Sequence, residues 1–221
     1  MAQSYFITGT DTGIGKTIVS CALLSAFSGR GKSAIGMKPV VTGSVCGEWA
    51  DVQAIIAASS VDAPKEWVNP YSFVPPIAPH LAAKKAGIEI DISFIRQAYC
   101  NLQRIADVVI VEGVGGIMVP LNGHNNVADM ACSLNLPLIL VVGMRLGCLN
   151  HALMTAKIAQ AAGLKLVGWV ANKIDPKMDS FDENFHALKS RLNFPLLGVL
   201  PFDKNIDTNN FSTLLDISQL E

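Results

Sequence analysis

Residues 5–17 read YFITGTDTGIGKT, and they say more about the architecture than any other stretch of the chain. A short apolar run is followed by a loop with three glycines and then by Lys16-Thr17, which open an apolar pattern at helical spacing. A strand, a glycine-rich loop, Lys-Thr and a helix in this order are typical of a loop that holds nucleotide phosphates. The usual spacing puts the first glycine at position 10; here it is Gly9, so the loop is one residue longer between its glycines.

The residue types in this loop suit an anionic ligand. Gly13 and Gly15 allow backbone N–H groups to converge on phosphate oxygens, and the N-terminus of the following helix adds partial positive charge. Lys16 is expected to reach the outer phosphates, and the Thr17 hydroxyl is expected to bind Mg²⁺. A glycine-rich turn with a solvated lysine is the alternative, which the flanking strand and helix disfavour. The candidate nucleotide ligands of the loop are Thr12, Gly13, Ile14, Gly15, Lys16 and Thr17.

Further apolar, strand-length runs are separated by helical patterns along the rest of the chain. After the first run at 5–7, they cover residues 34–37, 108–111, 138–142, 166–170 and 196–200. Between the first two runs, residues 17–28 predict a helix that Gly29 and Gly31 end. Short buried runs alternating with helices indicate an α/β fold, with a mostly parallel sheet flanked by helices. No linker-like composition interrupts the chain, so we predict one P-loop NTPase domain over residues 1–221.

One connection is much longer than the others. Residues 44–106 separate the second and third runs, and they contain a proline-rich stretch at 70–79 and patterns for two helices. A long connection of this kind is a place where a substrate site could be built.

Composition and charge exclude several classes of protein. Half of the residues are hydrophobic and only 16% are charged, which disfavours disorder. The net charge of -1 provides no long-range field to attract nucleic acid or an anionic membrane. Apolar runs such as 138–142 are far shorter than the roughly 20 residues that a membrane helix needs. Five widely spaced cysteines signal neither a disulfide framework nor a zinc site. We expect a soluble, cytoplasmic protein that binds no nucleic acid and no membrane.

Polar residues lie where three of the predicted strands end, and ligands bind at these ends of a parallel sheet. Lys38 follows the second strand, beside the phosphate loop. Glu112 follows the third strand, where P-loop proteins keep a carboxylate for Mg²⁺, and Gly115 and Gly116 permit close backbone approach. Asn172 ends a later strand, where its amide could read a base edge. An ordinary strand-end lysine paired with a surface acid is the alternative for Lys38.

Five motifs in a fixed order carry a resemblance to a known family. The chain contains GTDTGIGKT at 9–17, KPVVTG at 38–43, VEGVGG at 111–116, LGCLNHA at 146–152 and VAN at 170–172. In this combination the sequence closely resembles the dethiobiotin synthetases from about Tyr5 to Pro201, which is most of the chain. Several motifs in the correct order are far more specific than one motif alone.

The resemblance implies an enzyme, an ATP-dependent carbon–nitrogen ligase of biotin biosynthesis. Members of the family close a cyclic urea from 7,8-diaminopelargonate and CO2, through a phosphorylated carbamate, and release ADP and phosphate. The implied partners are this small-molecule substrate, ATP as co-substrate, Mg²⁺ as cofactor and a second copy of the chain in a homodimer. No protein nucleophile is required, so catalysis needs positioning and positive charge.

Site residues carry over from the family motifs to the matching positions of this chain. Lys16 and Lys38 are the implied catalytic residues, and Lys38 meets the carbamate and the transferring phosphoryl group. The implied Mg²⁺ ligands are Thr17, Asp51 and Glu112. The implied substrate contacts are Thr12, Lys38, Thr42, Leu146, Gly147, Cys148 and Asn150, of which the last four belong to a helix start that receives the substrate carboxylate from the neighbouring subunit. The implied nucleotide ligands after the loop are Glu112, Gly115, Gly116 and the purine-reading Asn172.

Two departures from the family pattern matter. Many members of the family carry glutamate at the position of Gly13, so any contact made by that acid is absent here. Residues 172–175 read NKID, which matches the N-K-x-D pattern by which many GTPases read guanine. This match leaves the preference for ATP open.

A regulatory nucleotide switch is the alternative function. Partition and cell-division ATPases share the longer loop, but they carry an extra lysine where this chain has Asp11. A regulatory GTPase would carry the motif D-x-x-G where residues 111–114 of this chain read VEGV.

Two residues also have simpler structural interpretations. Asp51 could cap the predicted helix 51–60, and His80 could be a packed side chain at a helix start. We therefore keep His80 out of the catalytic set.

Overall fold

The central sheet is parallel throughout. Within residues 2–203 and 211–220, which the computed structural model describes, it has six strands in the order β2-β5-β1-β6-β7-β8. Their bounds are β1 Gln3–Gly9, β2 Ala34–Met37, β5 Val108–Glu112, β6 Leu138–Met144, β7 Leu166–Lys173 and β8 Leu196–Leu200. Each apolar run of the sequence forms one of these strands, so the predicted parallel α/β fold is confirmed.

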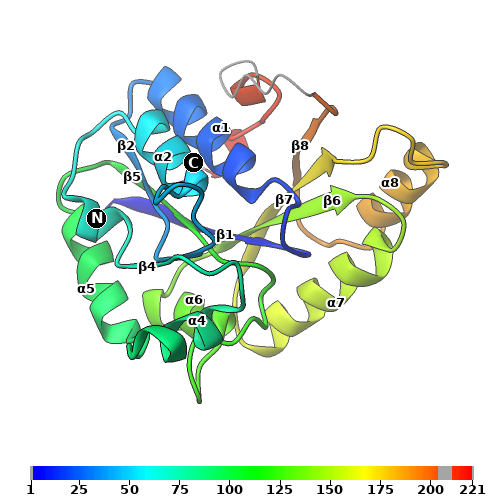
Figure 1. Cartoon of the computed structure of the whole chain (residues 1–221). Helices are drawn as coiled ribbons and strands as arrows, with labels where there is room; N and C mark the ends of the chain where they lie inside the picture. Colours follow the sequence, from blue (N-terminus) through cyan, green and yellow to red (C-terminus); the bar gives the residue numbers. More distant parts are fainter. Residues whose placement is uncertain (1, 204–210, 221) are drawn as a thin grey trace.

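Helices cover both faces of this sheet (Figure 1). On one face lie α1 (Lys16–Gly29) and α2 (Ala50–Ala58); on the other lie α5 (Ile92–Leu102), α6 (Val127–Leu134) and α7 (Cys148–Ala161). Other helices in the described part of the chain include α3 (Lys65–Val68), α4 (Pro79–Ala86), α8 (Phe181–Lys189) and a 3₁₀ turn at Ser218–Leu220. The described chain is therefore a single domain of three layers, with the sheet in the middle.

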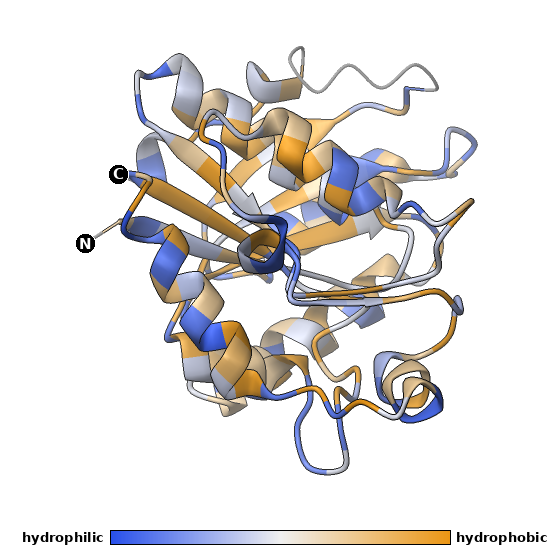
Figure 2. Cartoon of the chain, turned by 60° about the vertical axis from the view of Figure 1, so that its left-hand side comes forward, coloured by the Kyte–Doolittle hydropathy of each residue, from blue (hydrophilic) through white to orange (hydrophobic). Residues whose placement is uncertain are grey.

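The strands are apolar on both sides because both faces of the sheet are covered. Every residue of β2, β5 and β6 is buried. Figure 2 shows the central strands mainly in the hydrophobic colour, whereas the helices carry both colours, as expected for elements with one buried face.

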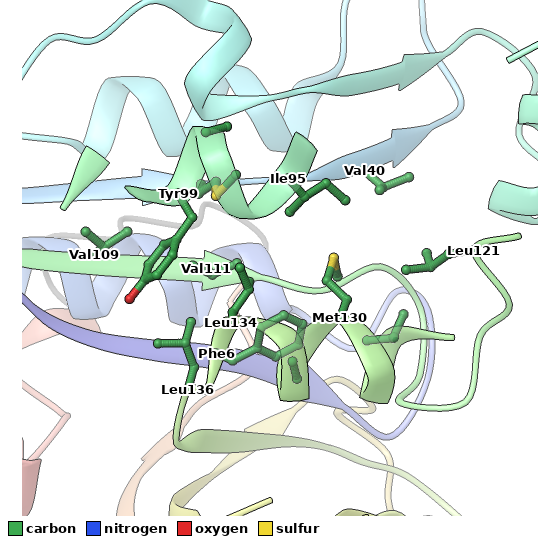
Figure 3. Packing of buried hydrophobic residues seen from close by; sticks show 14 of the residues in the cluster. Phe6, Val40, Ile95, Tyr99, Val109, Val111, Leu121, Met130, Leu134 and Leu136 are labelled. Atoms are coloured by element: carbon green, nitrogen blue, oxygen red, sulfur yellow. The ribbon is translucent and has the colours of Figure 1, made fainter. Parts of the chain in front are cut away.

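The core lies on both sides of β1. On one side, Phe6 and the β5 residues Val109 and Val111 belong to a cluster with Ile95, Tyr99, Met130 and Leu134 of α5 and α6 (Figure 3). On the other side, Tyr5 and Ile7 belong to a cluster with Leu23, Leu24 and Phe27 of α1. Successive residues of β1 thus pack against helices on opposite faces of the sheet. Because β1 is held on both faces, the loop that follows it has a fixed position.

The long connection holds more elements than the sequence predicted. Residues 44–106, all of them described, contain the four helices α2 to α5 where two were predicted. In addition, β4 (Tyr71–Phe73) of the connection pairs in parallel with β3 (Val40–Thr42), which precedes the connection, in a small separate sheet. The prediction of two helices was wrong, and the shortest elements gave no signal because α3 has 4 residues and β3 and β4 have 3 each, too few for a periodic pattern to appear.

Helix α2 begins one residue earlier than predicted. Trp49 is its N-cap residue, and Asp51 lies inside the first turn with its carboxylate on Lys38. The interpretation of Asp51 as a helix cap is therefore wrong: the side chain points to an ammonium rather than to the free N–H groups of its own helix.

The two ends of the described chain lie on the same side of the molecule, as Figures 1 and 2 show. The Gln3 amide and the Tyr5 hydroxyl both donate hydrogen bonds to the carbonyl of Leu220. The tail after Pro201, where the resemblance carried by the motifs ends, includes residues 204–210, which lie outside the described residues. No helix in the described part of the chain is long and apolar enough to cross a membrane. All five cysteines are free thiols.

Candidate active site

The loop between β1 and α1 has the backbone conformation of a phosphate-binding turn. Gly13 and Gly15 have φ angles of 72° and 85°, which residues with a Cβ rarely adopt. Helix α1 begins at Lys16, and no side chain of the described residues caps its first turn. Its free N–H groups and the positive end of its dipole therefore remain for an anion.

Lys16 lies inside this turn with its side chain largely buried. Its ammonium donates a hydrogen bond to the carbonyl of Asp11 at 2.7 Å. Burial, together with the nearby positive charge of Lys38, lowers the pKa of Lys16 to about 8. Because burial disfavours its charged form, Lys16 would gain from a polyphosphate bound in the turn.

Glu112 connects the phosphate loop with the end of β2. It is 1% exposed, and its Oε1 accepts hydrogen bonds from the Thr17 hydroxyl at 2.9 Å and from the Lys38 ammonium at 2.5 Å. On α2, Oδ2 of Asp51 lies 3.1 Å from the same ammonium. Residues from α1, α2, β5 and the end of β2 thus meet at one point.

The charges in this cluster stabilise one another. Burial alone would lower the pKa of Lys38, but the attraction of Glu112 and Asp51 outweighs burial, and the pKa is raised above its ordinary value. Burial likewise would raise the pKa of Asp51, but Lys38 outweighs it and the pKa is lowered. At neutral pH, Lys38 is therefore an ammonium and Asp51 a carboxylate.

The cluster also fits a divalent cation. Oε2 of Glu112 is buried without a hydrogen-bond partner among the described residues, which costs free energy unless a cation or a donor binds there. Proteins commonly hold Mg²⁺ with one or two carboxylates and the phosphates of a substrate, and a P-loop Thr adds its hydroxyl. Thr17, Asp51 and Glu112 offer these groups. Because the described residues contain no group of three or more His, Cys, Asp or Glu side chains placed to hold a metal, phosphate oxygens would have to complete the shell.

A cavity of about 660 Å³ opens at the carboxyl ends of β1, β2 and β5. Of the site residues predicted from the sequence, its wall contains Thr12, Gly13, Gly15, Lys16, Thr17, Lys38, Thr42, Asp51, Glu112 and Gly115. The wall also contains apolar residues that the sequence analysis did not assign, among them Val41, Val114, Val119 and residues 76–79. The signal for residues 76–79 was the proline-rich stretch at 70–79, predicted only in general terms as a place for a substrate site, whereas Val41 and Val114 lie inside the family motifs without an assigned role.

Asn172 contacts the phosphate loop outside the cavity wall. The wall of the cavity, as the described residues define it, leaves out Ile14, Gly116 and Asn172. The amide nitrogen of Asn172 donates a hydrogen bond to the carbonyl of Ile14 at 2.8 Å, and the side chain packs so closely that a Cβ on Gly15 would collide with it. Because one N–H of the amide is held on the Ile14 carbonyl, the amide has one fixed orientation, in which Oδ1 and the second N–H remain for a ligand.

The segment at the start of α7 lies apart from this cavity. Leu146, Gly147, Cys148 and Asn150 are absent from its wall. Gly147 has a φ angle of 91° at the N-cap, and no side chain of the described residues caps α7 either. Leu146 is 96% exposed, and Met154 and Ile158 on α7 are exposed as well. We refer to Leu146, Met154 and Ile158 as the α7 patch. Arg145, the residue before Leu146, forms a salt bridge with Asp11 of the phosphate loop, with Nη2 and Oδ2 2.5 Å apart.

Comparison with known proteins identifies close relatives in sequence. A family model described as an AAA domain matches residues 3–210. The chain is 56% identical over 220 residues to the ATP-dependent dethiobiotin synthetase BioD of Nitrosospira multiformis, a match that covers 100% of this chain and 97% of that protein. It is 53% identical over 203 residues to the enzyme of the same name from Aromatoleum aromaticum, with 90% of each chain covered.

Solved structures of similar fold are remote in sequence. The septum site-determining protein MinD of Pyrococcus horikoshii, complexed with Mg-ADP, matches with a TM-score of 0.60 at 15% identity, covering 100% of this chain and 94% of that one. A ParA family ATPase from Chlorobium tepidum matches with a TM-score of 0.57 at 13% identity, covering 93% and 87%. These likenesses support the P-loop NTPase fold alone.

Proposed function

The chain belongs to the dethiobiotin synthetase family, and we propose that its reaction takes place in the cavity at the carboxyl ends of β1, β2 and β5. The enzyme is an ATP-dependent cyclo-ligase that forms dethiobiotin. The assignment of the site depends above all on Glu112, which joins the buried ammonium of Lys38 to the phosphate loop through Thr17. Phosphates bound to this loop would lie beside that ammonium.

We assign three steps to the reaction. One amine of 7,8-diaminopelargonate loses a proton and attacks CO2, which forms a carbamate. A carbamate oxygen then attacks the γ-phosphorus of ATP, and the bond from this phosphorus to ADP breaks. The second amine attacks the carbonyl carbon, loses a proton and expels phosphate, which closes the urea ring. The chain supplies position and charge rather than a nucleophile.

The two lysines stabilise different parts of the reacting group. Lys16 and the N–H groups of the loop hold the outer phosphates of ATP. Lys38 meets the carbamate, and its longest contact, with the Gly113 carbonyl at 3.3 Å, is the one that a carbamate oxygen can replace. The hydroxyls of Thr12 and Thr42 on the cavity wall are assigned to the substrate.

Thr17, Asp51 and Glu112 are the residues that would hold Mg²⁺. The unpartnered Oε2 of Glu112 supports this assignment, and so does the position of the Thr17 hydroxyl beside Oε1. A bound Mg²⁺ would neutralise charge that develops on the phosphoryl group during transfer.

The substrate chain and its carboxylate require two different environments. The apolar wall of the cavity, including Val41, Val114 and Val119, suits the methylene chain of diaminopelargonate. We assign the carboxylate to the uncapped start of α7 in a second copy of the chain, at Leu146, Gly147, Cys148 and Asn150. The exposed α7 patch supports this homodimer, because Leu146 makes almost no contact within its own chain.

The geometry of Asn172 favours ATP over GTP. With one N–H on the Ile14 carbonyl, the Asn172 amide is held so that its acceptor Oδ1 and its second N–H, which adenine N7 can accept, are offered to the base. Adenine carries an amino donor at position 6, which pairs with this acceptor, whereas guanine carries an oxygen there, which repels it. The nearby NKID match with GTPases therefore does not imply guanine specificity.

A single assay tests the proposed function. Enzyme, diaminopelargonate, bicarbonate and one Mg-NTP at a time are mixed, and both the product mass and the released phosphate are measured. We expect dethiobiotin and phosphate in equal amounts, with ATP as the preferred nucleotide. Phosphate release that does not depend on the diamine would instead favour the nucleotide-switch function.

A further inference from the structure

Lys38 stands at a break between two sheets. β2 ends at Met37, which pairs with Val111 in the central sheet, and β3 begins at Val40 in the small sheet. Lys38 and Pro39 lie between these ladders, and Pro39 has no N–H group to donate. The backbone of Lys38 is therefore held by something other than strand pairing.

The last residue of α3 and the residue that follows it supply the missing bonds. The N–H of Lys38 donates to the Val68 carbonyl at 2.8 Å, and the Lys38 carbonyl accepts a hydrogen bond from the side-chain amide of Asn69 at 2.7 Å. The same amide donates to the Tyr71 carbonyl at 3.1 Å. Asn69 is 6% exposed and does not line the cavity, and its hydrogen bond to a residue of the site is the one to Lys38.

The two polar atoms of the Asn69 side chain differ in their hydrogen bonding. Oδ1 of Asn69 is buried and has no hydrogen-bond partner among the described residues. A buried acceptor without a partner lowers stability, so the residue carries a cost that an apolar side chain of similar size would avoid. Its nitrogen, in contrast, satisfies the carbonyls of Lys38 and Tyr71 at once.

We propose that Asn69 is a positioning residue of the ring-closing reaction: its amide fixes the Lys38 peptide between the two sheets and thereby fixes the place of the ammonium. The proposal rests on the role of Lys38 in the proposed function. The Lys38 ammonium lies at the end of a long side chain, so a small rotation of the Lys38 peptide moves the ammonium appreciably. A displacement of about 1 Å at a reacting group can lower turnover about 100-fold.

The test is a double-mutant cycle on kcat. Asn69→Leu removes the amide at similar volume, and Lys38→Ala removes the ammonium. Asn122→Leu is the matched control, because the Asn122 amide also donates to a backbone carbonyl, that of Ile90 at 2.9 Å, in a loop that does not line the cavity.

We expect Asn69→Leu to lower kcat about 10- to 100-fold and to leave the KM for ATP within about threefold of its original value. Asn122→Leu should leave kcat unchanged. In the Lys38→Ala background, Asn69→Leu should cause no further loss of kcat, because both changes act on the same ammonium. A residue with only a structural role would lower thermal stability without this pattern in kcat.

Three results would overturn the proposal. An unchanged kcat in Asn69→Leu would do so, and so would independent, multiplying losses in the double variant, which would show that Asn69 acts without Lys38. Full activity of Lys38→Ala would overturn the proposed role of Lys38 together with the positioning role of Asn69. If Asn69→Leu fails to fold, Asn69→Ser takes its place: it keeps a donor on a side chain too short to hold both carbonyls, and the same non-additive loss is expected.

Discussion

Replacement of Lys38 by methionine should destabilise the fold as well as the reaction. The change keeps a long side chain but leaves the Glu112 carboxylate, 1% exposed, without the ammonium that lies 2.5 Å from it. Removing one partner of a buried ion pair costs about 3–5 kcal/mol. The contact with Asp51, whose side chain is 45% exposed, adds less than about 1 kcal/mol because water and salt screen it. We expect a total loss of about 3–5 kcal/mol, almost all of it due to Glu112.

Urea unfolding at neutral pH without nucleotide or Mg²⁺ measures this loss directly. Lys84→Met on the exposed face of α4 is the matched control and should stay within about 0.5 kcal/mol of the original chain. The double variant Lys38→Met/Glu112→Gln should recover most of the loss, because it removes the unpaired charge. A loss below about 1 kcal/mol in Lys38→Met would refute the reasoning, since Glu112 would then have found water or another counter-charge.

Three further predictions concern the nucleotide and the second copy of the chain. Gly15→Ala should weaken ATP binding at least about tenfold in calorimetry, for two reasons: the added methyl group would collide with Asn172, and the φ angle of 85° at this position is strained for alanine. Unchanged affinity would contradict the assigned phosphate-binding turn. The kcat/KM for ATP should exceed that for GTP about 10- to 100-fold, and equal values would contradict the acceptor role of Oδ1. Leu146→Asp should halve the particle mass in sedimentation without a change in thermal stability, because the side chain is 96% exposed; an unchanged mass would rule out the α7 patch as the dimer contact.

The sheet and the phosphate loop were predictable from the sequence because their signals are local. Strands buried on both faces are continuous apolar runs, such as 138–142, and these stand out against the helices between them. The loop at 9–17 joins a strand to a helix without interruption, so its residues are contiguous in sequence as well as in space.

Contacts between distant segments were not predictable. The resemblance assigned Asp51 and Glu112 to Mg²⁺ and Lys38 to the carbamate, and only the fold shows that a single ammonium contacts both carboxylates. Asn69 precedes a proline and has the appearance of an ordinary turn residue, so its bond to Lys38 gives no signal in the sequence. Asn172 was predicted to read the base, and its second task, holding the Ile14 carbonyl, likewise depends on tertiary structure.

The position of β1 has a consequence for synthesis on the ribosome. β1 is the first strand of the chain, yet it lies between β5 and β6, and Gln3 pairs with Val108. The strand therefore emerges long before either neighbour and has no edge to join until β5, which begins at Val108, has been translated. Closing such a long loop is entropically costly and slow. Until then β1 stays apolar and unpaired in the nascent chain. ATP cannot stabilise it at that stage, because the pocket that binds ATP also needs Glu112 and the residues after it.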